Sequence, residues 1–558
     1  MRAGIAADLV LRGGVILPLS RGFANPTALA VSDGVIAAIG SDDAMAPLIG
    51  NRTTVIELNG RTVMPGLIDG HAHLDREGLK QLLPSLAGCA SISAIVDRLS
   101  RLAAQTPPGR WIVTMPLGEP PEYRWSESMF EEGRLPDRRD LDRASSEHPI
   151  LIRSAWGYWP GRVPLVTIAN SVALERSGMS SRSASPSPLL RIERDGRGIP
   201  TGRVFEDTLQ PLAEFTLFRD APNFTAEDRM RTLRASMRAY NEAGTTGIFE
   251  GHGVADNVID AYRRVRRDGG MTVRASLVFS PGWSGASEAD VASWVQREAA
   301  RLRGEGDEWL HIAGLFSELE AEPAETRLRA SCAPQTGWAG FRYDSGLPTA
   351  ALDRLLEAAA RERLRVCTLD SAMVDRFIAI GERVPIDDLR WVVAHPSTLD
   401  TAQIAGLAAH GIVVTALTGT FIWRRASTLL ARIGADREET ICPLRSLLDA
   451  GVPTVLASDN VPVSLWPCIW HACERIDRET GRVIAPGQRI TRGEALQCST
   501  VHGAWLCKDE ESRGTLEPGR QADLIVLPDN PLTVDAERLP ALVPELTIVG
   551  GKVVSRRA

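Results

Sequence analysis

A pair of histidines separated by one residue is the strongest chemical signal in this sequence of 558 residues. His71 and His73 follow a short apolar run, Leu67-Ile68-Asp69, that predicts a strand. Side chains two positions apart on a strand point to the same side, so both imidazoles can reach one metal ion through neutral ring nitrogens. The alternative is a pair of surface histidines, which the flanking Pro-Gly and Asp-Gly pairs disfavour.

Three further polar residues come where a predicted strand ends. His252 and His395 follow two such strands, and Asp459 follows the apolar run 453–458. The active sites of (β/α)8 barrels lie at the carboxyl ends of the strands, so these residues are candidates for the same site. An aspartate in this position caps the next helix about as often as it does chemistry. The other five histidines fall in helical or loop contexts, where structural roles are more common.

Short apolar strands alternate with amphipathic helices through most of the chain, which predicts a parallel sheet closed into a barrel. We therefore predict an α/β protein, a distorted (β/α)8 TIM barrel over residues 65–513. Residues from about 85 to 235 break the alternation and predict an inserted subdomain near the barrel mouth. The expected strands are 245–249, 272–279, 365–368, 391–394, 412–417 and 454–457, with helices such as 349–363 and 402–410 between them.

Both ends of the chain have a different, β-rich character. Strands are expected at 8–16, 28–32, 35–39 and 54–58, and again at 522–527 and 546–554. Neither end is long enough to bury a core alone. We therefore predict that residues 1–64 and 514–558 combine into one small β-sandwich.

Composition narrows the class of protein. The net charge is −7, which argues against nucleic acid or an anionic membrane as the main partner. The sequence contains no run of about 18 apolar residues, so we expect no membrane-spanning helix. The eight cysteines lack the spacing of a disulfide framework, which favours a reducing, cytoplasmic location. We expect a cytoplasmic protein that acts on a small molecule; the oligomeric state stays open, with a homodimer among the options.

The motifs around these residues resemble the amidohydrolase superfamily. The resemblance rests on the His-x-His after Pro65–Gly70, on Ser458–Pro462 and on the closing run 514–524. More narrowly, the chain resembles the amidohydrolase family 3 branch, which includes YtcJ-like proteins and N-substituted formamide deformylases. Weaker motifs of the branch lie at 109–112, 135–142, 148–151, 170–174 and 200–206.

This resemblance implies a role for each candidate. His71 and His73 would ligate the metal, and His395 would ligate it or polarise the substrate carbonyl. Asp459 would bind the metal and take the proton from the attacking water. A metal lowers the pKa of water towards about 7, and a carboxylate beside it can relay the proton to the leaving group.

One departure from the branch concerns the number of metal ions. Members commonly place a lysine on a middle strand, where it can be carbamylated to bridge two metals. The matching stretch 340–347 carries Arg342, which cannot form that carbamate. The chain has three lysines, Lys80, Lys508 and Lys552, and none lies near the end of a predicted barrel strand. We therefore expect one divalent ion, most simply Zn²⁺.

A second departure concerns a ligand. Cys367 stands in the predicted strand 365–368 where the branch has a ligand histidine. A thiolate is a competent zinc ligand, so Cys367 is a candidate metal ligand. Buried cysteine is also a common packing residue. His252 and Glu250, beyond the predicted strand 245–249, could replace the missing ligand instead.

Three residues are candidate substrate contacts: Glu206, His252 and Trp159. Glu206 ends a motif of the branch, and its alternative is a salt-bridged loop carboxylate. Trp159 belongs to an aromatic group that could form an apolar lid over the substrate or pack the core of the insertion. The members of this group are Trp111, Tyr123, Trp125, Trp156, Tyr158 and Trp159.

These features together predict a metal-dependent amidohydrolase that cleaves an amide-type C–N bond, other than a peptide bond, in a small, partly apolar molecule. The alternatives are a deaminase or a decarboxylase of the same superfamily, or a degenerate homologue without catalysis. Fold alone does not decide among these.

Overall fold

A computed structural model describes residues 6–20, 22, 25–156, 164–338, 340–369 and 371–557. At its centre is a parallel sheet of eight strands that neighbour one another in sequence order. The backbone N–H of Gly70 donates to the carbonyl of Leu456 at 3.0 Å, which brings the first and last strands together. The predicted (β/α)8 barrel is therefore confirmed. Its strands are β7 Leu67–Asp69, β13 Thr245–Val254, β14 Arg274–Phe279, β15 Leu310–Phe316, β18 Val366–Thr368, β19 Val392–Ala394, β20 Val413–Ala416 and β21 Thr454–Leu456.

One barrel strand, β15, is absent from the predicted set. His311 and Gly314 interrupt its apolar run, so the local pattern for a strand is weak. Non-local pairing decides its structure, because β15 pairs with β14 on one side and with β18 on the other.

Helices pack around the barrel and cover its outer face. Four of them begin with capping boxes, at Thr225, Ser287, Asp400 and Thr491. The predicted end of the insertion near residue 235 falls inside α7, whose Leu233 belongs to the barrel core. The helices are α7 Ala226–Glu242, α8 Asp256–Arg267, α9 Glu288–Gly304, α11 Thr349–Arg361, α12 Val374–Gly381, α13 Thr401–Ala409, α14 Ala426–Ile433, α15 Leu444–Asp449, α16 Trp466–Glu474, α17 Arg492–Cys498 and α18 Val501–Cys507.

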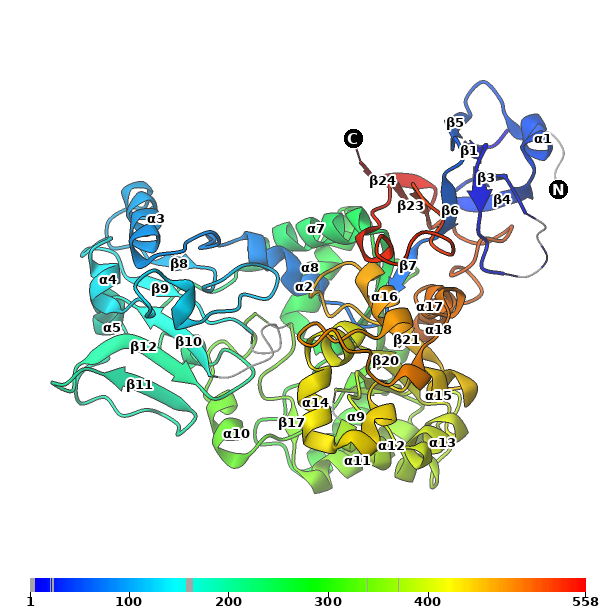
Figure 1. Ribbon diagram of the computed structural model, residues 1–558. Coiled ribbons are helices and arrows are strands. Elements are labelled where there is room, and N and C mark those ends of the chain that lie inside the picture. The colour runs from blue at the N-terminus through cyan, green and yellow to red at the C-terminus, as the bar shows by residue number, and fades with distance from the viewer. Residues whose placement is uncertain are drawn as a thin grey trace.

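The insertion forms a separate five-stranded sheet, seen at the left of Figure 1. The helix α3, Ile92–Gln105, packs on it through an apolar cluster that includes Ile95 and Leu99. Of the predicted aromatic group, Tyr123 and Trp156 lie buried in a cluster between the insertion and the barrel loops. The strand order is β11 Leu190–Arg194, β12 Pro200–Glu206, β10 Leu165–Ala169, β9 Ile150–Ile152 and β8 Ile112–Thr114.

Both ends of the chain meet in two small sheets, at the upper right of Figure 1. One apolar cluster draws residues from both sheets, among them Leu11 and Leu524, so the predicted sandwich of both termini is confirmed. The first sheet is β4 Val35–Gly40, β3 Ala28–Ser32, β1 Leu9–Arg12 and β5 Thr54–Glu57; the second is β2 Val15–Ile16, β6 Thr62–Pro65, β22 Leu524–Leu527, β23 Leu546–Val549 and β24 Lys552–Arg556.

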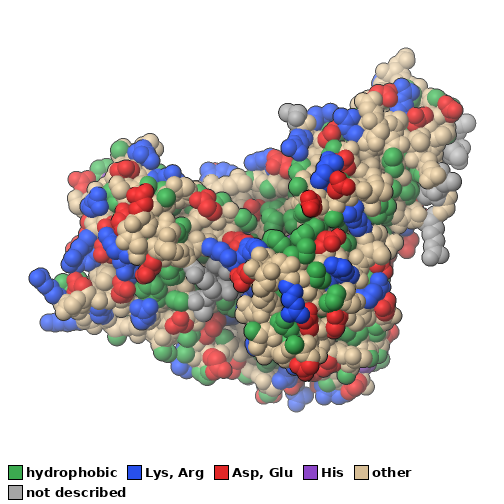
Figure 2. Space-filling view, in the orientation of Figure 1, with side chains coloured by type: hydrophobic (Ala, Val, Ile, Leu, Met, Phe, Trp, Pro, Cys, Tyr) green, Lys and Arg blue, Asp and Glu red, His purple; other side chains and the backbone are tan. Residues whose placement is uncertain are grey.

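Acidic and basic side chains are interspersed over the face shown in Figure 2. Within the described part of the chain, no helix has both the length and the apolar character needed to cross a membrane.

Candidate metal centre and pocket

Four barrel strands bring the candidate residues to one end of the barrel. Parallel strands end on the same face, so side chains far apart in the sequence meet there. β13 extends beyond its predicted end, which puts two candidates on one face of the strand, two positions apart. The residues are His71 and His73 after β7, Glu250 and His252 on β13, His395 after β19 and Asp459 after β21.

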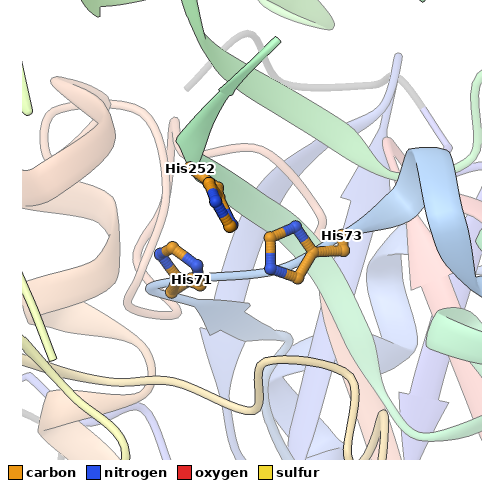
Figure 3. Close-up of side chains that lie close together, drawn as sticks. All are labelled: His71, His73 and His252. Carbon is orange, nitrogen blue, oxygen red and sulfur yellow. The ribbon is translucent and has the colours of Figure 1, made fainter. Parts of the chain in front are cut away.

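Three imidazoles form the centre of the site (Figure 3). Ring nitrogens of His71, His73 and His252 all lie within 4.8 Å of one another. The ring centroids of His71 and His73 are 4.9 Å apart, and those of His73 and His252 are 5.3 Å apart. His395 also lies beside His71, with 4.9 Å between their ring centroids. The structure therefore brings all four predicted histidines together.

Two carboxylates hold the ring of His73 between them. Its Nδ1 lies 2.8 Å from Oε1 of Glu250, and its Nε2 lies 2.8 Å from Oδ1 of Asp459. Burial, together with the charges of Arg76, His395 and Lys80, holds the pKa of His73 well below its ordinary value, so the ring is neutral. A neutral imidazole has one N–H and can donate to one carboxylate. The second contact therefore requires a protonated carboxyl or a cation between the two atoms.

His71 has the environment of a metal ligand. It is fully buried, and neither ring nitrogen has a hydrogen-bond partner among the described residues. Burial lowers the pKa of His71 and of His252 well below the ordinary value, which leaves both rings neutral. A buried polar atom without a partner is costly, and a divalent cation would satisfy one nitrogen of the His71 ring. The donor set therefore fits a metal ion.

Hydrogen bonds join the segments that carry His71 and Asp459. Asp69, fully buried, accepts hydrogen bonds from the Ser458 hydroxyl and from the backbone N–H of His71. The backbone N–H of Asp459 donates to the carbonyl of His71 at 3.0 Å. His395 and Asp459 have φ angles of 40° and 53°, a region that ordinary residues seldom occupy. Such strained positions concentrate at functional sites, because the surrounding structure must hold them.

A pair of carboxyls lies behind His73. Atoms of His73, Asp75 and Glu250 all lie within 4.8 Å of one another. Burial raises the pKa of both carboxyls, and the charge of Asp75 raises that of Glu250 further. The Tyr262 hydroxyl and the backbone N–H of Leu74 donate to Oε2 of Glu250. Two carboxyls this close cannot both ionise easily, so the pair retains a proton and orients His73.

A small pocket opens above the histidines. The space inside it that the centre of a water molecule can reach is about 40 Å³. Part of its wall is a π-helical turn, Gly419–Arg424, which supplies Thr420 and Phe421. π-Helical turns are frequent at functional sites. The lining residues are Arg76, Trp156, His252, Leu369, His395, Leu417, Thr420, Phe421, Arg425 and Asp459.

Cys367 does not join this group. Its side chain is fully buried in the apolar interior of the barrel, in one cluster with Phe249 and Phe316. In the pairing of β18 with β19, Cys367 lies opposite Val392, which precedes His395 by three residues. Three residues of strand span roughly 10 Å, so Cys367 lies about that far below His395 along the strand direction. Burial raises the pKa of its thiol to about 12. These surroundings are those of a buried packing residue, which was the alternative to a metal ligand at this position.

The alignment of Arg342 with a middle-strand lysine is wrong. Residues 340–345 form a loop outside the barrel, where the Arg342 guanidinium makes two contacts of 2.9 Å with Asp344. The middle barrel strand is β15, which ends in Phe316. No lysine stands there either, so the reason to expect a single metal ion remains.

The other substrate candidates differ in placement. Glu206 is buried in the insertion, where Thr167, Ser154 and two backbone N–H groups donate to its carboxylate. These bonds direct it into the insertion rather than to the pocket. Trp159 lies outside the described residues. His252 lines the pocket, and its ring stacks on Phe341 with 4.4 Å between centroids.

The sequence reasoning missed Arg76. It follows His73 by three residues, on the short helix α2, Leu74–Glu77. Its place directly after the second histidine was the available signal, because that segment was already predicted to lie at the barrel mouth.

Comparisons with known proteins agree with this arrangement. A family model described as amidohydrolase family matches residues 54–555. The N-substituted formamide deformylase of Arthrobacter pascens is 26% identical over 541 residues, 94% of each chain. The putative amidohydrolase YtcJ of Bacillus subtilis (strain 168) is 25% identical over 98% of this chain and 99% of its own. The fold is shared with an uncharacterized metal-dependent hydrolase from Pyrococcus furiosus, with a TM-score of 0.67 and 20% identity over 94% of this chain and 100% of that one.

Proposed function

The chain belongs to the amidohydrolase family, and from that premise we propose that it hydrolyses an amide-type carbon–nitrogen bond. The substrate would be a small, partly apolar molecule, and one divalent metal ion, Zn²⁺, would take part. The observation that carries the proposal is the group of three neutral imidazoles beside the Asp459 carboxylate, at the base of a pocket. The name of the similar deformylase describes action on N-substituted formamides, which supports an amide substrate.

His71, His73 and His252 are the residues that would hold the ion. Three histidines with one open position are a donor set found in catalytic zinc sites. When bound, the ion supplies Lewis-acid polarisation and makes water more acidic. The Glu250–Asp75 pair supports this role, because a ligand histidine needs a fixed partner on its second nitrogen.

Asp459 moves the proton in this proposal. Its Oδ1 faces the pocket beside His73, where it takes one proton from the attacking water as the new C–O bond forms. It then gives that proton to the amide nitrogen as the C–N bond breaks. The products are a carboxylic acid and an amine, and Asp459 returns to its ionised form.

His395 would orient the substrate carbonyl. It is buried, lines the same pocket as Asp459, and burial lowers its pKa, so it is neutral and retains one ring N–H. That N–H can donate to the carbonyl oxygen, where negative charge develops during attack.

The test is amine release from N-formylbenzylamine and N-acetylbenzylamine by the protein after zinc reconstitution. We expect turnover that is lost on chelation and restored by added zinc. Elemental analysis on the same samples gives the metal content. A protein that binds no metal after reconstitution would contradict the proposal and favour the degenerate homologue.

Two further measurements separate the other family chemistries. Ammonia release from an aromatic amine, without any amide turnover, would favour a deaminase. Carbon dioxide release from an aromatic acid would favour a decarboxylase. The proposal requires an amine as the nitrogen product and an acid as the carbon product.

A further inference from the structure

Among the described residues, one buried cation in the pocket has neither a hydrogen-bond nor an ion-pair partner. The Arg76 side chain is 2% exposed, and its Nε has no hydrogen-bond partner within the described part of the chain. Among the described residues, no carboxylate forms an ion pair with it, although it lines the pocket with Asp459 and His395. Its guanidinium lies over the Trp156 ring, 4.9 Å from the centroid.

The other buried arginines of the described chain differ from Arg76 because they have hydrogen-bond or ion-pair partners. Arg153 and Arg274 pair with carboxylates at 2.7 Å, and Arg475 donates to three backbone carbonyls. Each of the other buried arginines among the described residues also has a hydrogen-bond or ion-pair partner. These others are Arg229, Arg365, Arg424 and Arg513.

The neighbouring carboxyls do not neutralise Arg76 directly. Asp75 and Glu250 lie nearby, but neither forms an ion pair with Arg76 among the described residues. Lys80, on the next turn, is different because Glu77 binds it at 2.6 Å. Burial of an unpaired charge is costly, so an uncompensated guanidinium inside a pocket is explained best by an anionic ligand.

We propose that Arg76 binds a carboxylate of the substrate, so that the preferred substrates are amides that also carry an acid group. A guanidinium presents its N–H groups as a planar fork that matches the two oxygens of a carboxylate. The Trp156 ring contacts the guanidinium, with 4.9 Å between the guanidinium carbon and the ring centroid, and so limits the movement of that fork. The reaction itself rests on the proposed function, whereas binding of the carboxylate does not.

Binding without turnover tests the anchor first. The zinc-loaded protein is titrated with 3-phenylpropanoate and with its neutral amide, 3-phenylpropanamide. We expect the acid to bind about 10- to 100-fold more tightly than the amide, the range for a charge-assisted hydrogen bond. Arg76→Met should remove that preference and leave amide binding unchanged. Equal binding of both probes by the parent would overturn the proposal.

Controls separate the anchor from other roles. Arg327→Met, on the exposed face of α10 (Pro323–Ala330), should keep the preference of the parent. Arg76→Lys retains the charge but not the fork, and should show an intermediate preference. A preference that survives in Arg76→Met would mean that the acid binds the metal instead, which contradicts the proposal.

The melting temperature tests a structural role for Arg76. Arg76→Met should melt at or above the temperature of the parent, because the change removes an uncompensated buried charge. A melting temperature lower by several degrees would indicate a structural role and would also contradict the proposal.

Turnover then tests the substrate class. N-Formylphenylalanine, as each enantiomer, is compared with N-formyl-2-phenylethylamine. We expect one enantiomer to have a kcat/KM at least tenfold above that of the neutral amide, and Arg76→Met to lower this ratio towards one. If neither compound is hydrolysed but the acid still binds through Arg76, the proposed function fails and the anchor stands. Hydrolysis of both compounds at equal kcat/KM would overturn the anchor and leave the proposed function in place.

Discussion

Replacement of Cys367 by alanine separates packing from metal ligation at this position. The side chain is fully buried in the apolar interior of the barrel. Loss of a group of about one methylene, with the cavity it leaves, should lower the free energy of unfolding by about 1–2 kcal/mol. A ligand role would require the thiolate. Burial raises the pKa of the Cys367 thiol to about 12, so ionisation at neutral pH costs about 7 kcal/mol before any metal compensates it.

The assay is zinc affinity, measured by competition with a chromophoric chelator, together with denaturant unfolding of the metal-free protein. We expect Cys367→Ala to bind zinc within about threefold of the parent and to unfold at lower denaturant. His71→Ala is the matched control, because His71 is equally buried but lies in the imidazole group. It should lose zinc at concentrations that saturate the parent.

Cobalt substitution gives the decisive result. A thiolate-to-cobalt charge-transfer band in the parent that disappears in Cys367→Ala, with a fall in affinity of about 100-fold or more, would refute the packing interpretation. The strand register that sets Cys367 below His395 would then be wrong as well.

Four other predictions can be checked on the same preparations. Asp459→Asn should lower kcat by at least about 1000-fold while metal content stays near that of the parent, because the amide keeps the shape but cannot take the proton; near-parental kcat would exclude Asp459 as the base. His252→Ala should lose zinc whereas His395→Ala should keep it and lose kcat, as elemental analysis and turnover will tell. Metal titration should reach full activity at about one equivalent per chain, and two tightly held ions would contradict the single site. Burial lowers the pKa of His471 to about 3; stability should therefore fall as the pH drops from about 6.5 towards 3, and His471→Leu should flatten that part of the unfolding profile.

Local sequence determined the architecture and the first two proposed ligands. The alternation of apolar strands with amphipathic helices is a property of short windows, so the barrel and its strand ends could be predicted. The spacing of His71 and His73 is local as well, since side chains at i and i+2 share one side of a strand. His395 and Asp459 followed from the same rule, because parallel strands end on one face. The strand β15 did not follow, because His311 and Gly314 weaken its pattern and its neighbours supply the pairing.

Only the tertiary structure decided which of these residues meet. The register of β18 against β19 sets Cys367 level with Val392, below the site, and no local pattern encodes that register. The extension of β13 brings His252 to the first two histidines, although the sequence had offered it only as a candidate substrate contact and as one possible substitute for a missing ligand. Arg76 shows the same limit most clearly. An arginine on a short helix is unremarkable in sequence, and its missing partner becomes visible only when the fold has buried it, because burial and pairing depend on segments far away along the chain.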